Sequence, residues 1–423
     1  MKNKEIEFET LHSNKHRIHF LIGFVCVVVL LVVFIVGTSH ARYRVTESIP
    51  LVNGTINYSL ADLNIVAITV DGEAIDAIPE GNYELTENSY CTVNGEEDSS
   101  ISISYEADKQ LLTVTPFTTK GTKCYLDFTE KTSVGDIILG NVEVNESTPN
   151  FASVATTDEG VYATTDNLGT SYYFRGAVTN NYVQFAGFCW RIIRINGDGS
   201  IRIIYDGTNA HANGESSDDR QTGTSAFNSS YNQSYYVGYT YTTSQRPSTQ
   251  NSWTASTIKG ALDSWYATNI SGKGLDDKVV NTPGFCNDRN TATGSNWISS
   301  GTTFYYAARD RLQTNKKPIL DCNDNSDLYT TKVGLVTADE VAIAGGVYGS
   351  SNNSYYLYTG DSYWTMSPHN FSGSFAYAFV VDNVGYLDNA SVNATIGVRP
   401  VINIASNVTI TGSGTISDPY VVL

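Results

Sequence analysis

The feature that most constrains this chain is an apolar run near its start. From Ile18 to Val36 the sequence reads IHFLIGFVCVVVLLVVFIV, and after His19 no charged or strongly polar side chain follows until Thr38. At about 1.5 Å of rise per residue, a helix of this length just crosses a hydrocarbon layer of about 30 Å. We therefore expect a transmembrane helix over residues 18–38.

The charges that flank this run predict its orientation. Basic residues stand on both sides of it: Lys2, Lys4, Lys15 and Arg17 before, Arg42 and Arg44 after. Because Lys and Arg are enriched in cytoplasmic segments, we expect residues 1–17 to be a cytoplasmic tail and the bulk of the chain to lie outside the cell membrane. A cleaved signal peptide is the alternative, since Ser39-His40-Ala41 offers small residues at a suitable spacing. The run is longer than the apolar core of a signal peptide, which is about 7–15 residues.

The polar surface of this chain is largely uncharged. It has 43 Asp and Glu against 26 Lys and Arg, a formal net charge of −17, although charged residues make up only 16% of the chain. Nucleic acid is excluded as a partner because its phosphates require a basic surface. We expect instead an extracellular glycan or surface protein as the partner, and the membrane as a partner of the N-terminal helix.

The cysteines indicate an oxidising compartment. One of the six lies in the apolar run and five follow it; outside the cell, five thiols suggest two disulfides and one leftover. Sequence alone does not give the connectivity, but domain limits narrow it. Cys91 and Cys124 share the first segment, and Cys286 and Cys322 flank one loop-rich stretch. Cys189, in the apolar run GFCWRIIRI, is expected to be a buried free thiol.

Short strand-like runs separated by turns dominate residues 45–130, among them NIVAITVDGEAI, SISISYEA and LLTVTPF. Their spacing predicts a small β-sandwich that a disulfide would help to stabilise. Residues 131–160 read as a linker, with ILGNVEV followed by a polar stretch.

Residues 161–423 combine strand and helix signals. A hairpin is predicted where two apolar runs flank Asn196-Gly-Asp-Gly-Ser200, because Asn-Gly and Asp-Gly supply the positive φ angles of a tight turn. Helices are predicted over 256–270, from apolar spacing after a Ser/Thr cap, and after Thr337, which forms a capping box with Glu340. The fold class that we expect is therefore α+β: a transmembrane helix, an all-β sandwich module and a loop-rich mixed domain.

Several of these segments together resemble a family. The stretches YYFRGAVTNNYVQFAGFCWRIIRINGDGSIRIIYDG, STIKGALDSWY, FCNDR, GLVTADEVAIAGG, YWTMSP and GVRPVINI resemble, in this order, modular surface proteins of Gram-positive gut bacteria. The C-terminal motifs are also distantly similar to the C-type-lectin-like fold of formylglycine-generating enzymes. The resemblance implies a C-type-lectin-like domain over 161–423. We expect structural roles for residues within these motifs: Arg175, Trp190, Trp364, Ser367, Pro368, Gly397, Arg399 and Pro400.

Catalytic motifs are not found, and we expect a protein that is not an enzyme. The similar oxidases use a cysteine pair late in the domain, whereas no cysteine follows Cys322 here. His211 and His369 are isolated in sequence, without the spacing of a zinc site. A nucleophile elbow and Gly-rich phosphate loops are also absent. Glycoside hydrolysis needs only a pair of carboxylates, and any two Asp or Glu residues could meet in the fold. A cell-wall enzyme is therefore the less favoured alternative.

One polar segment has the alternating oxygen ligands of a calcium loop, at Asp321, Asn323, Asn325 and Asp327. It lacks the Gly at the sixth place and the Glu at the twelfth. Calcium is one hypothesis for this segment, and a polar turn closed by a Cys286–Cys322 disulfide is the other. We assign no cofactor and no metal.

Aromatic and amide side chains crowd one late segment. The candidate ligand-binding residues there are Tyr363, Trp364, His369, Asn370 and Phe371. Rings stack on sugar faces and amides bond to hydroxyls, so these residues would suit a neutral glycan or a peptide. The alternative is that Trp364 and Tyr356 belong to the core. We expect an adhesin-like extracellular protein, and a structural component of a surface assembly or secretion apparatus is the alternative function.

Overall fold

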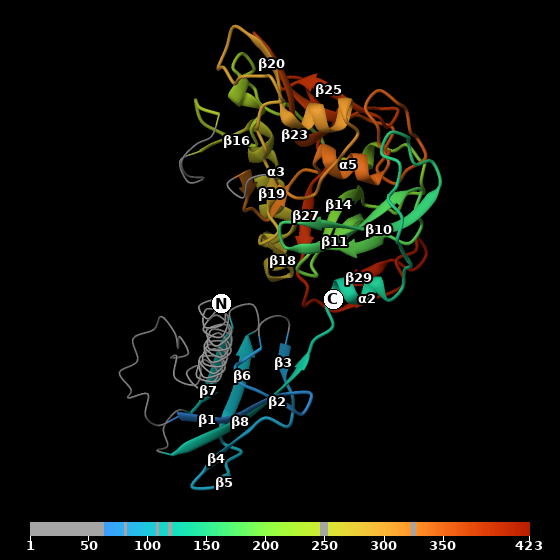
Figure 1. Ribbon diagram of the computed structural model, residues 1–423. Coiled ribbons are helices and arrows are strands. Elements are labelled where there is room, and N and C mark those ends of the chain that lie inside the picture. Colours follow the sequence, from blue (N-terminus) through green and yellow to red (C-terminus); the bar gives the residue numbers. More distant parts are fainter. Residues whose placement is uncertain (1–62, 80–82, 107–109, 117–120, 246–252, 323–326) are drawn as a thin grey trace, which may run out of the picture. The chain divides into compact units, whose positions relative to one another are not determined.

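The computed structural model describes residues 63–79, 83–106, 110–116, 121–245, 253–322 and 327–423 (Figure 1). They form two compact units, one ending at Lys131 and the other running from Thr132 to Leu423. Each unit has its own sheets and its own hydrophobic core.

The first unit is β-sandwich-like. Its strands are β1 (Leu63–Val70), β2 (Glu73–Ile75), β3 (Tyr83–Leu85), β4 (Tyr90–Val93), β5 (Glu96–Glu97), β6 (Ser102–Glu106), β7 (Leu111–Thr115) and β8 (Thr122–Glu130). One sheet has the order β2-β1-β8-β4-β5, with β3 also paired to β8, and β6 pairs with β7. Alternate residues of β8 face the core, as the two-residue period of a strand requires, and they include Cys124, Leu126 and Phe128.

Both predicted disulfides are present. Cys91 and Cys124 stand directly opposite each other on β4 and β8 and are bonded. Cys286 is bonded to Cys322 in the second unit. Cys189 is free and buried, as expected. The sequence thus predicted two disulfides and one leftover thiol, and the structure supplies the connectivity that the sequence left open.

The larger sheet of the second unit has eleven strands and the path β18-β27-β14-β13-β11-β10-β9, to which β12, β22, β28 and β29 add. Its strands are β9 (Val144–Asn145), β10 (Asp158–Asp166), β11 (Gly169–Gly176), β12 (Tyr182–Phe185), β13 (Phe188–Ile195), β14 (Ile201–Gly207), β18 (Val279–Val280), β22 (Val333–Gly334), β27 (Val401–Ile404), β28 (Ile410–Thr411) and β29 (Tyr420–Val422). The predicted hairpin is β13 and β14, which pair antiparallel. Both strands are buried almost throughout, because the core covers the sheet here.

A second sheet has the order β15-β26-β23-β24-β25, with β20 paired to β23. Its strands are β15 (Thr224–Ser225), β20 (Thr303–Tyr305), β23 (Tyr363–Ser372), β24 (Ala376–Val381), β25 (Leu387–Ser391) and β26 (Ile396–Gly397). Short pairs add β16 (Thr240–Tyr241) with β17 (Thr254–Ala255), and β19 (Phe285–Cys286) with β21 (Leu328–Tyr329).

The helices of the second unit are short: α2 (Val134–Leu139), α3 (Thr257–Asn269), α4 (Ala307–Arg309) and α5 (Ala338–Ala344). Both predicted helices are present. Ser256 caps α3 through its side chain. The capping box of Thr337 and Glu340 begins α5, and Gly345 ends it in the left-handed conformation at φ 117°.

The segment expected as a linker, residues 131–160, belongs to the second unit from Thr132 onward. It contains α2 and β9. Val134 and Ile138 are fully buried in the main core of that unit. A capping box at Ser133 begins α2 and fixes the start of the unit.

The expected fold class is wrong. The described chain is mostly β-sheet, and its longest helix, α3, has 13 residues. In the described ranges no helix is both long and apolar enough to cross a membrane, and residues 1–17 and 18–38, the predicted tail and span, lie outside those ranges. Helix signals were overweighted, because two well-capped helices stand among many short β-branched and aromatic runs that pair as strands.

Candidate functional site

Three of the predicted ligand-binding residues belong to the core. Tyr363, Trp364 and Phe371 lie on β23 with fully buried side chains. The Tyr363 hydroxyl donates to the carbonyl of Leu357 at 2.8 Å, and Trp364 Nε1 donates to that of Ser225 at 2.9 Å. Strand β23 lies inside its sheet, so these rings pack against neighbours and are not available to a ligand. Of the two alternatives given for Trp364, ligand binding or a place in the core, the structure therefore supports the core.

His369 and Asn370 also face inward. His369 is 5% exposed, stacks on Tyr348 at 5.6 Å between ring centroids and lies edge-on to Phe379 at 4.7 Å. Its Nδ1 contacts Oδ1 of half-buried Asn370 at 2.6 Å. Burial lowers the pKa of His369 to about 4, so its ring is neutral near pH 7.

The residues expected to be structural have buried side chains with clear partners. Arg175 donates five hydrogen bonds, to the Glu159 carboxylate and to four backbone carbonyls, those of Asn150, Ser153, Ala342 and Ile343. Arg399 donates to the carbonyls of Tyr205 and Leu357 and to Asp206. These contacts join segments that are far apart in sequence.

The remaining structural residues act through packing and backbone contacts. Trp190 is fully buried and donates to the carbonyl of Phe185. The Ser367 hydroxyl accepts the N–H of Ala338 at the start of α5. Pro368 stands on β23 opposite Ala378, and the carbonyl of Pro400 accepts the N–H of Tyr205.

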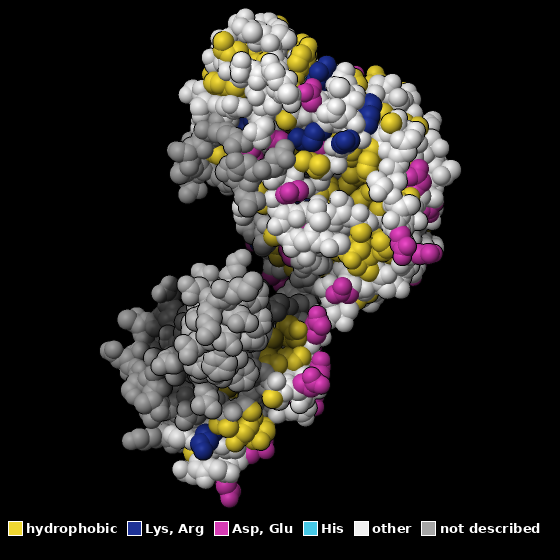
Figure 2. Space-filling view, in the orientation of Figure 1, with side chains coloured by type: hydrophobic (Ala, Val, Ile, Leu, Met, Phe, Trp, Pro, Cys, Tyr) yellow, Lys and Arg dark blue, Asp and Glu magenta, His cyan; other side chains and the backbone are white. Residues whose placement is uncertain are grey.

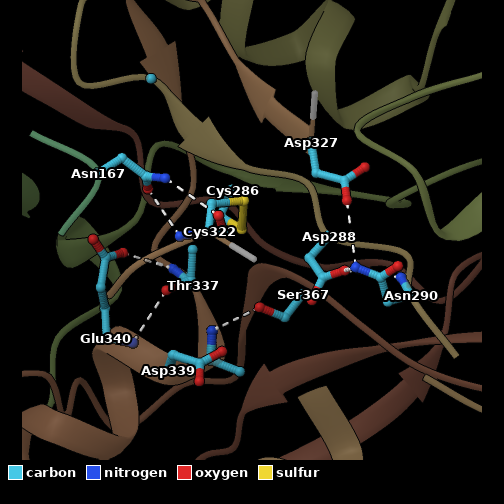
Figure 3. The surroundings of a disulfide bond; sticks show 12 residues. Asn167, Cys286, Asp288, Asn290, Cys322, Asp327, Thr337, Asp339, Glu340 and Ser367 are labelled. Atoms are coloured by element: carbon cyan, nitrogen blue, oxygen red, sulfur yellow. Dashed lines mark hydrogen bonds between the residues drawn. A yellow bond between two sulfur atoms is a disulfide. The ribbon is translucent and has the colours of Figure 1, made fainter. Parts of the chain in front are cut away.

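A narrow charged pocket lies beside the Cys286–Cys322 disulfide (Figure 3). Asn167 clamps Cys322: its Oδ1 accepts the Cys322 N–H at 2.8 Å, and its Nδ2 donates to the Cys322 carbonyl at 3.2 Å. On the other side, the start of α5 brings in Thr337, Asp339 and Glu340 (Figure 3). Three arginines line the pocket as well: Arg194, Arg202 and Arg311.

Each of these arginines is paired with carboxylates. Glu340 accepts from Arg202 at 2.7 Å and from Arg194 at 3.1 Å, and Arg194 also donates to Asp166 at 2.6 Å. Burial by itself would raise the pKa of Glu340, but Arg202, Arg194 and the Thr337 N–H outweigh it and hold the pKa at about 2. These two arginines and two carboxylates form a first charged group, which is buried and has no net charge.

Arg311 forms the second charged group. It donates to Asp339 at 2.9 and 3.1 Å and to Asp288 at 3.2 Å. Burial alone would lower the pKa of Arg311, but the two carboxylates outweigh it and raise that pKa above its ordinary value. Within each group the arginines and carboxylates are bonded to one another. The pocket therefore serves to stabilise the fold, because these ion pairs hold α5 against the sheet.

The calcium hypothesis falls partly outside the described residues, since Asn323 and Asn325 lie there. Asp321 is exposed at the charged pocket, and Asp327 is buried with its carbonyl accepting the N–H of Asn287 at 2.8 Å. Among the residues that the structure describes, no group of three or more His, Cys, Asp or Glu side chains could hold a metal ion.

His211, isolated in sequence, has two carboxylates beside it in space. Its Nδ1 lies 2.9 Å from Glu215 and its Nε2 lies 2.7 Å from Asp219. The three residues belong to one loop after β14, so the contact closes that loop.

A wider groove lies on the far side of Leu320, which lines both hollows. Its walls are residues 144–151, strands β10 and β11, and residues 318–320. Tyr173, Leu320 and Ile343 form a buried floor, and Tyr173 stacks on Tyr162 at 5.8 Å and 20°. Figure 2 shows apolar side chains gathered over β10 and β11 on the face seen.

The rim of this groove combines rings with uncharged polar groups. Tyr172 and Phe151 are half-buried, and Ser147 and Thr148 are exposed. Glu146 is the one residue with a formal charge at neutral pH among the described residues that line the groove. The groove can therefore offer ring faces and hydroxyls to an uncharged ligand.

Sequence reasoning missed the groove because its walls come from three separate stretches of chain. One signal was available: Tyr172 and Tyr173 are adjacent on a strand, so their rings must lie on opposite faces of the sheet. Comparison with protein-family models, curated proteins and solved structures found no match. The similarity to C-type-lectin-like domains and to modular surface proteins accordingly stays a prediction.

Proposed function

We propose that the second unit is an extracellular binding domain that takes an uncharged glycan chain in the groove between residues 144–151, β10 and β11. The observation that carries this proposal is the lining: Tyr172 and Phe151 at a half-buried rim, hydroxyls of Ser147 and Thr148 beside them, and the buried apolar floor. The disulfides support a location outside the cytoplasm, where such bonds persist.

The physical argument concerns what each group would recognise. Sugar rings present C–H faces that pack on aromatic rings and hydroxyls that need hydrogen-bond partners. An acidic polymer would find no positive charge among the described residues that line the groove and would be repelled by Glu146. A basic polymer would find only that one opposite charge. The groove is open, which suits a chain that extends beyond the site.

The test is binding of the full chain to a glycan array, followed by calorimetry with the best neutral oligosaccharide. We expect Tyr172→Ala to weaken binding about tenfold, the factor that about 1.4 kcal/mol represents, and Tyr172→Phe to retain most of it. Tyr90→Ala, in the first unit, is the matched control for removal of an exposed ring. An unchanged affinity in Tyr172→Ala, with an unchanged melting temperature, would contradict the proposal.

A protein partner is the second candidate, and one observation favours it. Strand β9 ends the larger sheet, so in the described chain its outer edge has no neighbouring strand. An extended segment of another surface protein could pair there and lie along the groove. Binding of a surface protein that slows amide exchange at Val144 and Asn145, and that Tyr172→Ala leaves intact, would favour this candidate over the glycan.

A further inference from the structure

The second unit carries another aromatic surface, remote in sequence from the groove. Tyr231 and Phe375 are 36% and 39% exposed, yet their rings stack face to face at 4.8 Å and 17°. Part of each ring is therefore open to solvent although the two rings cover one face of each other. We call Tyr231, Phe375 and the exposed Ile298 the aromatic tip.

Backbone hydrogen bonds fix the aromatic tip. The Ala376 N–H donates to the carbonyl of Tyr231 at 2.8 Å, which ties the two ring-bearing segments together. Phe375 closes the turn between β23 and β24, where Ser372 and Phe375 bond through their backbones and Gly373 has a φ of 92°. This turn needs glycine, because other side chains are strained at such a φ.

The loop that carries Ile298 is bonded, just after that residue, to both of the other segments. The carbonyl of Ser299 accepts the N–H of Ser234, and the N–H of Gly301 donates to the carbonyl of Gly373. The tip is therefore preformed, so a ligand would bind without the entropic cost of ordering a loop.

The three segments that build the tip have no charged side chain of their own, and the Arg309 guanidinium packs over the Tyr305 ring, 4.1 Å from its centroid. Residues 228–234, 294–306 and 369–376 contain no Asp, Glu, Lys or Arg, and their polar side chains are Ser, Thr, Asn, Gln, Tyr, Trp and a neutral His369. Figure 2 shows the end of the unit near β20 as mostly apolar and uncharged polar surface on the face seen, with Lys or Arg side chains at its margin. The chain as a whole carries a net charge of −17, so this uncharged surface is a local property.

We propose that the aromatic tip is a second binding surface, for a neutral carbohydrate whose C–H face stacks on the exposed rings of Phe375 and Tyr231. Neutral hydroxyls and amides beside flat rings complement a neutral sugar, whereas a charged ligand finds no opposite charge on the side chains of the three segments themselves. The proposal does not rest on the groove, because the tip uses different strands and loops.

The test uses the full chain in affinity gel electrophoresis with a β-glucan, an α-mannan and a galactan as neutral probes, and an anionic polysaccharide as the charged probe. We expect at least one neutral polysaccharide to retard the chain and the anionic one not to. The double variant Tyr231→Ala/Phe375→Ala should bind about tenfold more weakly. Tyr231→Phe/Phe375→Tyr, which keeps both rings, should bind like the wild type.

Binding at the groove and binding at the tip can be tested separately, because each site has its own variant. Tyr172→Ala should leave binding at the tip unchanged, so failure of one site is distinguishable from failure of the other. The tip proposal is overturned if no neutral probe binds with Tyr172→Ala in place, or if the double alanine variant binds like the wild type. It is also overturned if sedimentation shows a dimer that the double variant abolishes, since the tip would then be covered by a second copy.

Discussion

Replacing Glu340 by glutamine should destabilise the second unit strongly. The Glu340→Gln side chain would have almost the same shape and would still accept hydrogen bonds, but it would leave Arg194 and Arg202 buried with one carboxylate fewer. Both guanidinium groups are almost fully buried, at 5% and 2% side-chain exposure. Breaking a buried ion pair on one side costs roughly 3–5 kcal/mol.

The pKa of Glu340 gives a second estimate of the same quantity. The folded protein holds it at about 2, against an ordinary value of 4.5. Each factor of ten in proton affinity corresponds to about 1.4 kcal/mol, so the ionised Glu340 stabilises the fold by roughly 3 kcal/mol at neutral pH. Folding lowers this pKa, so the stabilisation is complete above pH 4.5 and disappears as the pH falls to about 2.

Urea unfolding followed by tryptophan fluorescence measures the second unit alone. All 5 tryptophans of the chain lie in it: Trp190, Trp253, Trp265, Trp297 and Trp364. The matched control is Asp263→Asn, which breaks the ion pair between Lys259 and Asp263. The Asp263 side chain is 46% exposed. Exposed pairs are worth less than about 1 kcal/mol, so the control should unfold close to the wild type.

Two results would refute this reasoning. One is a Glu340→Gln variant whose free energy of unfolding at pH 7 equals that of the Asp263→Asn control. The other is a difference between variant and wild type that stays constant from pH 6 down to pH 2.5, because the ionised carboxylate would then not be its source.

Three further predictions concern the second unit. Replacing Cys286 and Cys322 by Ser should lower the free energy of unfolding by about 4 kcal/mol on the chain-entropy estimate for their separation of 36 residues; an unchanged urea midpoint would contradict it. Burial raises the pKa of the Cys189 thiol, so maleimide should label it slowly in the folded chain and at once in urea. The ring signals of His369 should not titrate between pH 7.5 and 5.5 by nuclear magnetic resonance, because its pKa is about 4. A midpoint near 6.5 would show that the ring is exposed.

Local signals in the sequence predicted local structure well. The capping box of Thr337 and Glu340 and the turn at Asn196 involve neighbours along the chain, and the structure has both. Domain limits narrowed the disulfide pairings, and the structure gives the connectivity. Each of these predictions depended on residues whose partners are close by or few in number.

Burial was harder to predict, because it depends on which segments cover a strand. The residues of β23 read as a surface cluster of rings and amides, but strands pair with β23 along its edges and α4 and α5 pack against it, so Tyr363 and Phe371 are in the core. The groove, conversely, is assembled from residues 144–151, β10 and β11, and 318–320. No periodicity in one segment could have revealed it.

The contacts of Arg175 have a consequence for how the groove could change. Its guanidinium binds the backbone carbonyls of Asn150 and Ser153, at the end of the groove wall formed by residues 144–151, and these carbonyls would be present whatever side chains stood there. The wall is thus held independently of the identities of the residues that face a ligand. If the groove binds the proposed glycan, substitutions at the lining residues between 146 and 151 would alter its specificity while Arg175 still holds the backbone, so this wall is a suitable place for a library of variants.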